Sequence, residues 1–328
     1  MTLVRAPRFV NKIQRVFDVS TLDLIMRCPT LYNYKSRQGW RSRRARMKTN
    51  FGSAIHRACQ ILATQKFLRK SLDEAINLTL EVVLKEFGPQ IVELGWKRVR
   101  GKEIVNPAYG LDGLLRIVVW KGMEIYETKY TLAALEDGAP ALETLFEVPL
   151  PHSSTDNTDS PYRLSGRIDS ISLLHDELFV EDTKSTDKDL TESWFSMFNP
   201  SNQMYGYLWV LRKKLKIPVR GFSINGIQTL DNTARFRRAN FYPSDDQLDE
   251  WFDSAMEAIS RVTQYAKMEE FGSPAPWPQY FSACHSYGGC EFLNVCTIPA
   301  HLRGRWLNED FIQKYHPTFS EEPQDGSA

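Results

Sequence analysis

Residues 166–185 read GRIDSISLLHDELFVEDTKS, and this stretch decides the fold. Residues 162–174 and 177–183 are rich in the apolar and β-branched residues that are typical of strands. The two residues between them, His175 and Asp176, indicate a tight hairpin turn. The stretch therefore predicts two adjacent antiparallel strands.

The hairpin carries two carboxylates and a lysine that could bind a metal ion and act on a water molecule. Pairing across the turn brings Asp169 and Asp182 to the same edge of the sheet, and two converging carboxylates are costly unless a cation lies between them. Lys184 lies two residues after Asp182 and shares its face. Such carboxylates can hold a metal ion, while the ammonium orients or deprotonates a water beside it. The alternative is a solvent-facing edge with a cross-strand ion pair, since Asp-x-Lys is common by chance.

The pattern around the hairpin predicts helices on both sides of the strands. Ser20 and Thr21 are expected to begin a helix with a hydroxyl cap, and Asp23 lies near its positive end. Further helices are expected from Pro29 and Phe51 and over 71–87, 111–136, 194–215 and 244–267, and further strands over 142–150, 219–229 and 234–242. This order predicts an α/β or α+β sheet flanked by helices.

Composition sets the general class of protein. The chain has 328 residues, of which 42% are apolar and 25% charged, so it can bury a large core. Five cysteines are too few for a disulfide framework. Residues 1–16 lack the apolar run of a signal peptide, and no apolar run approaches a membrane span. We expect a soluble cytoplasmic protein.

The net charge of +1 conceals an uneven distribution. Residues 1–50 contain twelve Lys or Arg against two Asp, about +10, which leaves about −9 for the rest of the chain. The densest basic stretch lies among aromatic residues, and alternating cations and rings suit phosphates and bases. A solvated basic helix or flexible loop is the alternative interpretation. The expected DNA contacts in this stretch are Arg41, Arg43, Arg44 and Arg46.

Five motifs in a fixed order extend these observations over most of the chain. With them, the sequence resembles the RecB-like nucleases of the PD-(D/E)xK superfamily, which include the nuclease domains of RecB and AddB and the CRISPR-associated adaptation nucleases with an iron–sulfur cluster. The resemblance implies a restriction-endonuclease-like mixed sheet flanked by helices. The motifs span 20–32, 52–56, 166–169, 181–184 and 203–207.

The resemblance also implies roles for individual residues. His56, Asp169 and Asp182, with the backbone carbonyl of Thr183, are expected to bind Mg²⁺ or Mn²⁺, which suits hard oxygen ligands and one imidazole. Lys184 is expected to activate the attacking water, and Asp169 and Asp182 complete the catalytic set. A single histidine on an amphipathic helix is otherwise more often a packed or surface residue.

Three further positions follow from the same resemblance. Gln203 and Tyr207 lie four residues apart, share a helical face and are expected to place the DNA strand. An amphipathic core helix is the alternative. Glu147 matches an acidic residue often found on the preceding strand, although an exposed strand glutamate is the commoner explanation.

Four cysteines match a ligand pattern of the iron–sulfur nucleases, with one near the start of the chain and three near its end. Four thiolates can close around a 4Fe–4S cluster or a structural zinc ion. The first C-terminal gap is five residues rather than the usual two, and His285 could compete as a ligand. Cys59 is expected to be a buried core residue. The expected ligands are Cys28, Cys284, Cys290 and Cys296.

Together these features predict a metal-dependent DNA nuclease, most simply an exonuclease on single strands or duplex ends in recombination, repair or phage DNA metabolism. No Gly-x4-Gly-Lys-Ser/Thr loop is present, so any helicase partner would be a separate protein. A catalytically silent nucleic-acid-binding module and a zinc-stabilised interaction protein are the alternatives. The expected organisation is a basic helical segment over 1–50, a nuclease core over 51–270 and a cysteine-rich tail over 271–328.

Overall fold

The computed structural model describes residues 9–10, 13–43, 47–94, 96–99, 102–105, 110–156, 158–230, 232–273 and 277–314. The chain forms two compact units, each assembled from separate stretches of sequence. Unit 1 comprises residues 1–45, 146–166 and 245–328, and unit 2 comprises 46–145 and 167–244. The boundary crosses strands β8 (Leu142–Pro151) and β9 (Asp159–Leu174). Within the described residues, no helix is both long and apolar enough to span a membrane.

Unit 2 is built on a mixed sheet, as the family resemblance implied. β10 (Glu177–Thr186) pairs antiparallel with β9 and parallel with β11 (Val219–Thr229), and β12 (Ala234–Phe241) pairs antiparallel with β11. The short β7 (Thr131–Leu132) and β8 also pair with β9. A mixed α/β sheet flanked by helices is thus confirmed.

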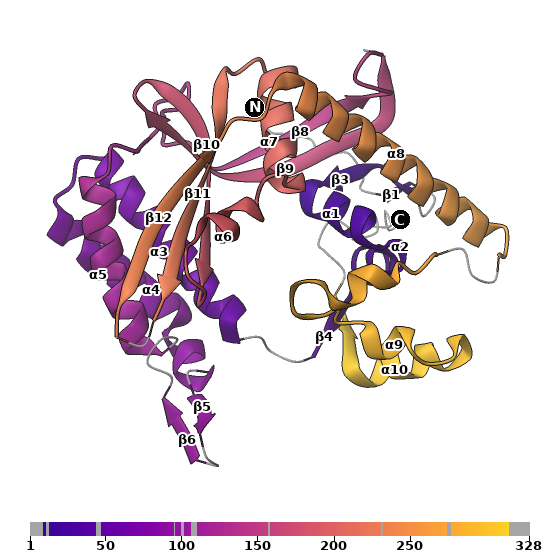
Figure 1. The fold of residues 1–328 in the computed structure, drawn as a ribbon, viewed down its shortest axis with the longest axis horizontal. Coiled ribbons are helices and arrows are strands. Elements are labelled where there is room, and N and C mark those ends of the chain that lie inside the picture. The colour runs from indigo at the N-terminus through magenta and orange to yellow at the C-terminus, as the bar shows by residue number, and fades with distance from the viewer. Residues whose placement is uncertain are drawn as a thin grey trace, which may run out of the picture. The chain divides into compact units, whose positions relative to one another are not determined.

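Adjacent residues of β11 show what covers each face of this sheet. Ile227 packs into a core with three helices, α3 (Met47–Phe67), α4 (Leu72–Leu94) and α5 (Leu111–Glu127). Gly226 points the other way, where a Cβ would lie 3.0 Å from Trp194 in α6 (Glu192–Ser196). Figure 1 shows α3, α4 and α5 beside the long strands β11 and β12. Helices therefore bury both faces, as the sequence pattern requires.

Two expected helices are shorter than predicted. The helix expected over 194–215 is divided into α6, α7 (Asn202–Trp209) and a π-helix, η2 (Val210–Lys214), because Pro200 has no N–H to donate and Ser201 caps α7. The helix expected over 111–136 ends at Glu127. At this end of the helix, the Lys66 ammonium donates to the backbone carbonyls of Ile125 and Thr128, each at 2.7 Å. These carbonyls therefore find a partner without a further helical turn.

Unit 1 contains α1 (Val19–Arg27), α2 (Pro29–Tyr32), α8 (Asp245–Glu270) and β3 (Val16–Asp18), which runs parallel to the first part of β9. The predicted hydroxyl cap of α1 is wrong, since the carboxylate of Asp18 caps the helix and accepts from the Thr21 N–H at 2.7 Å. The prediction missed Asp18 because a carboxylate two residues before Ser20 can satisfy the same free N–H groups as a hydroxyl.

The C-terminal part of unit 1 packs on α2. β4 (Trp40–Ser42) pairs with β13 (Phe311–Gln313), and Phe292 stacks on Phe311 with ring centroids 4.8 Å apart. This small core includes Cys28 and Leu31 and joins the first and last segments of the unit. The remaining elements are β1 (Phe9–Val10), β2 (Ile13–Gln14), η1 (Asn33–Arg37), β5 (Trp96–Val99), β6 (Lys102–Val105), η3 (Phe281–Gly288), α9 (Leu293–Cys296), η4 (Ala300–Leu302) and α10 (Arg303–Asp310).

Candidate active site

The β9–β10 hairpin aligns the two predicted carboxylates. Its turn residues, His175 and Asp176, have φ of 49° and 66°, which is the left-handed geometry of a tight hairpin. The register pairs Glu181 with Ser170. The next residues outward, Asp182 and Asp169, therefore stand opposite each other on one face.

Lys184 follows on the same face of β10, as the alternation predicted. Its Nζ lies 2.6 Å from Oδ2 of Asp182, whose residue is only 3% exposed. Thr183, between them, points to the opposite face, where the Asn225 amide donates to its hydroxyl at 3.3 Å. The strand thus places Asp182 and Lys184 on one face and Thr183, among buried polar and charged side chains, on the other.

The carboxylates have different proton affinities. Burial raises the pKa of Asp182 to about 6. The neighbouring Asp169 also raises this pKa, whereas the Lys184 ammonium lowers it. Burial alone would also raise the pKa of Asp169, but hydrogen bonds from His56 and Asp182 hold it below its usual value. Asp182 therefore takes up a proton at a higher pH than Asp169 does.

His56 reaches this pair from α3. Its Nε2 lies 2.9 Å from Oδ2 of Asp169, and that hydrogen bond raises the pKa of the imidazole in spite of burial. On its other side, the Gln60 amide nitrogen lies 3.2 Å from Nδ1. Gly52, one turn earlier in α3, lets the helix approach β10, because a Cβ there would lie 3.3 Å from the Ser185 hydroxyl.

Glu143, at the start of β8, is a site residue that the sequence interpretation missed. Its Oε1 accepts from the Gln60 amide, and its Oε2 lies 2.6 Å from Nε of Arg167. Its φ of 49° is uncommon for a residue with a side chain. Glu147, the acidic residue proposed on this strand, pairs instead with Arg163 in unit 1 at 2.7 Å. The irregular backbone at the start of β8 cannot be recognised from the sequence. The alternation of side chains along a regular strand therefore could not identify Glu143.

The residues fit a divalent cation. His56, Glu143 and Asp169 each offer one ligand atom, and these atoms lie within 4.8 Å of one another. Asp182 lies next to Asp169 on the neighbouring strand, and a cation between two adjacent carboxylates is favourable. Carboxylate oxygens with one imidazole suit Mg²⁺ or Mn²⁺.

Gln203 and Tyr207 of α7 lie beside the lysine. The Lys184 ammonium donates to Oε1 of Gln203 at 3.4 Å, and the Gln203 amide donates to the Tyr207 hydroxyl at 3.3 Å. That hydroxyl donates in turn to the backbone carbonyl of Arg167 at 2.8 Å. The predicted pair therefore connects Lys184 with the strand that carries Asp169.

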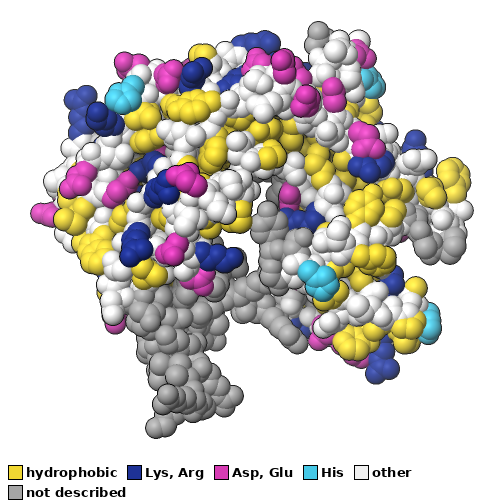
Figure 2. All heavy atoms as spheres, viewed as in Figure 1, with side chains coloured by type: hydrophobic (Ala, Val, Ile, Leu, Met, Phe, Trp, Pro, Cys, Tyr) yellow, Lys and Arg dark blue, Asp and Glu magenta, His cyan; other side chains and the backbone are white. Residues whose placement is uncertain are grey.

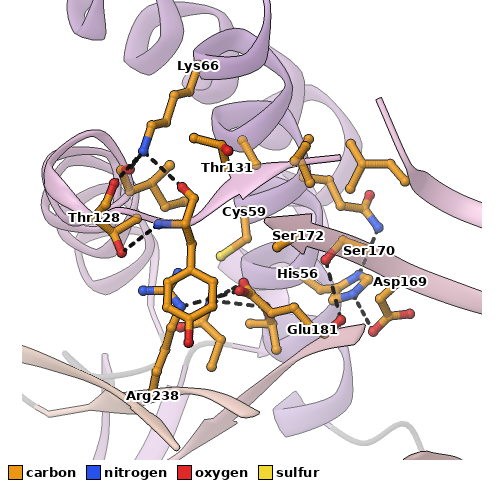
Figure 3. A pocket seen from close by; sticks show the side chains of 18 residues that line it. His56, Cys59, Lys66, Thr128, Thr131, Asp169, Ser170, Ser172, Glu181 and Arg238 are labelled. Carbon is orange, nitrogen blue, oxygen red and sulfur yellow. Dashed lines mark hydrogen bonds and ion pairs between the residues drawn. The ribbon is translucent and has the colours of Figure 1, made fainter. Parts of the chain in front are cut away.

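A polar pocket is lined by His56 and Asp169 together with Glu181, Thr183 and Arg238 (Figure 3). Arg238 of β12 points into it, pairing with Glu181 at 3.4 Å and with Glu124. Burial would lower the pKa of Arg238, but the two carboxylates raise it. The fully buried Lys121 contacts Glu124 at 2.6 Å. These charged residues tie α5 and β12 to the strand behind Asp182, and nothing in the sequence pattern indicated them.

The four predicted cluster ligands all lie in unit 1. Cys28 is buried in the small core, against which Cys290 and Cys296 pack, and the Cys290 N–H donates to the Cys284 carbonyl at 2.8 Å. Burial and the neighbouring thiols raise the pKa of Cys296 to about 11 and that of Cys290 in the same direction. Cys59 lies instead in the core of unit 2, as expected.

The basic stretch is only partly described, since Arg44 and Arg46 lie outside the described residues. The Arg41 guanidinium donates to the backbone carbonyls of Lys35 and, at 2.9 Å, Trp40. Arg43 is exposed and donates to the Asn308 carbonyl at 3.4 Å. On the face shown in Figure 2, basic and acidic side chains are interspersed over the described surface.

Comparison with known proteins identifies the family of this chain. A profile described as "PD-(D/E)XK nuclease superfamily" matches residues 17–297. The chain therefore belongs to the PD-(D/E)XK nuclease superfamily. No curated protein matches it significantly. A solved structure titled "Crystal structure of SSO0001" is similar at 11% identity over 61% of this chain and 74% of that one, with a TM-score of 0.25.

Proposed function

We propose that this protein is a metal-dependent DNA nuclease whose site consists of His56, Asp169, Asp182 and Lys184. The observation that carries the proposal is the meeting of these side chains from α3, β9 and β10, with Nε2 of His56 2.9 Å from Asp169 and Nζ of Lys184 2.6 Å from Asp182. Membership of a nuclease superfamily supports it. Glu143 completes the ligand group in place of Glu147.

The residues divide the work of phosphodiester hydrolysis. His56, Glu143, Asp169 and Asp182, with the Thr183 carbonyl, would hold Mg²⁺ or Mn²⁺, which when bound polarises the phosphate and acidifies a water. Lys184 orients that water and stabilises negative charge near Asp182. Gln203 and Tyr207 position Lys184 and β9, the β-strand that carries Asp169. The bound DNA passes beside the side chains of Gln203 and Tyr207.

The direct test is digestion of labelled DNA with Mn²⁺. The wild type is expected to release nucleotides, whereas Asp182→Ala and Lys184→Ala lose activity by at least about a hundredfold. Equal activity in all preparations, or none in any, would reject the nuclease. Linear and circular single strands of one sequence test the proposed exonuclease, because an exonuclease degrades only the linear strand. DNA and RNA strands compared in parallel give the sugar preference.

We further propose that Cys28, Cys284, Cys290 and Cys296 bind a 4Fe–4S cluster that holds the first and last segments of unit 1 together. The support is the small core that Cys28, Cys290 and Cys296 share, and the backbone hydrogen bond that joins Cys284 to Cys290. Anaerobically purified protein should contain iron and sulfide in equal amounts. Cys290→Ser should lose both, while Cys59→Ser, in unit 2, should retain both. Zinc in a colourless wild-type sample would show the structural zinc site instead.

A further inference from the structure

Arg167 carries an exposed guanidinium at the edge of the candidate metal site. Its side chain is 64% exposed, and it lies two residues before Asp169, hence on the same face of β9. The Tyr207 hydroxyl donates to its backbone carbonyl at 2.8 Å and so fixes the strand at this point. The residue is therefore held at its backbone, while its side chain extends toward solvent.

Glu143 restrains this tip. Its Oε2 lies 2.6 Å from Nε of Arg167, yet the same carboxylate belongs to the group that fits a divalent cation with His56 and Asp169. One carboxylate charge has thus two competing cationic partners. A divalent ion would attract this carboxylate more strongly than an exposed guanidinium does, and would also repel that guanidinium.

We propose that Arg167 is a phosphate-binding subsite which Glu143 covers until a divalent ion occupies the site. With a divalent ion held by His56, Glu143 and Asp169, the Glu143 carboxylate would face the ion, and the Arg167 guanidinium would be left to bind a non-bridging oxygen of a phosphodiester in the nucleic-acid strand. The planar fork of arginine suits such an oxyanion by paired hydrogen bonds. This inference rests on the proposed nuclease function and adds a reason for DNA to bind only after the metal.

The test measures DNA binding separately from cleavage. The parent is Lys184→Ala, which keeps every metal-binding carboxylate. Fluorescence anisotropy of a labelled single strand is recorded with EDTA and with Mn²⁺, over a range of salt concentrations. The variants added to this parent are Arg167→Ala and Glu143→Gln. The matched control is Arg220→Ala, whose side chain is 60% exposed and lies 3.4 Å from Glu177 in the same unit.

Three results are expected. Mn²⁺ raises the DNA affinity of the parent, and Arg167→Ala removes about tenfold of that gain and lowers the salt slope by about one. Glu143→Gln leaves Arg167 without its competing carboxylate, so affinity in EDTA rises by about tenfold, while Mn²⁺ binding measured by electron paramagnetic resonance weakens. Arg220→Ala behaves as the parent, and Arg167→Lys recovers part of the loss.

The inference is overturned if Arg167→Ala binds DNA like the parent under both conditions, or if Glu143→Gln binds no better than the parent in EDTA. If either occurs while the wild type still cleaves DNA with Mn²⁺, only the phosphate subsite fails. If the wild type neither binds nor cleaves DNA, the proposed function fails with it.

Discussion

Nε2 of His56 lies 2.9 Å from Oδ2 of Asp169, although the two residues come from α3 and β9. The contact exists because α3 packs closely on β10 at Gly52 and the hairpin holds Asp169 opposite Asp182. A helix and a strand that are separate in sequence thus supply one ligand group, and its charges determine how the site responds to protons and metal.

The proton affinities of Asp182 and His56 predict how stability depends on pH without metal. Folding raises the pKa of Asp182 from 3.8 to about 6 and raises that of His56. The folded state then binds more protons than the unfolded state, so the unfolding free energy in EDTA falls as pH rises through about 6, by at most about 3 kcal/mol for Asp182. Urea titrations at several pH values measure it.

Asp182→Asn is the matched control for this effect. It should show a flatter pH profile and greater stability than the wild type at pH 8 in EDTA. Because Mn²⁺ competes with the same protons, wild-type Mn²⁺ affinity should rise through about pH 6, with proton release detectable by calorimetry in different buffers. Parallel profiles for the two proteins would contradict the assignment.

Arg238→Met should destabilise unit 2. It leaves Glu181 and Glu124 beside the pocket without their shared cation, and breaking a buried ion pair costs about 3–5 kcal/mol. Arg237→Ala, on the same strand, removes a pair with the exposed Glu192 and should cost less than about 1 kcal/mol. Chemical denaturation of both variants provides the comparison; equal losses would show that Arg238 has no special role.

Tyr207→Phe should slow cleavage by about tenfold without weakening Mn²⁺ binding. The change removes the hydroxyl that donates to the Arg167 carbonyl and accepts from Gln203, so the strand and Lys184 lose a common support. Tyr205→Phe, on the same helix, removes only a hydrogen bond to Asn199 and should retain full activity. Kinetics at saturating Mn²⁺ test the pair, and comparable rates for both would argue against a positioning role.

Arg41 and Arg43 should behave differently in DNA binding. Arg43→Ala should lower affinity and reduce the salt slope by about one, because its side chain is exposed. Arg41→Ala should chiefly lower stability, since its guanidinium donates to backbone carbonyls. Salt-dependent anisotropy and thermal melting separate the effects. A loss of salt slope in Arg41→Ala alone would reverse the assignment.

Local pattern was sufficient for the hairpin and most strands. Alternation along β10 places Asp182 and Lys184 together, and the two-residue turn sets Asp169 opposite, because strand period and turn length are local properties. The same local rules misplaced the cap of α1 and merged α6 with α7. At α1 the carboxylate of Asp18 caps the free backbone N–H groups. Between α6 and α7, Pro200 interrupts the helical hydrogen bonds and Ser201 caps a new helix.

The sequence by itself therefore determined the mixed sheet, the hairpin and the order of the motifs that mark the superfamily. Only the tertiary structure decided that Glu143 rather than Glu147 joins His56, that Arg167 stands at the site's edge, and that Arg238 supports the strand from behind. These relationships depend on which elements pack against one another. Packing joins residues far apart in the chain, so no period or spacing along the sequence encodes them.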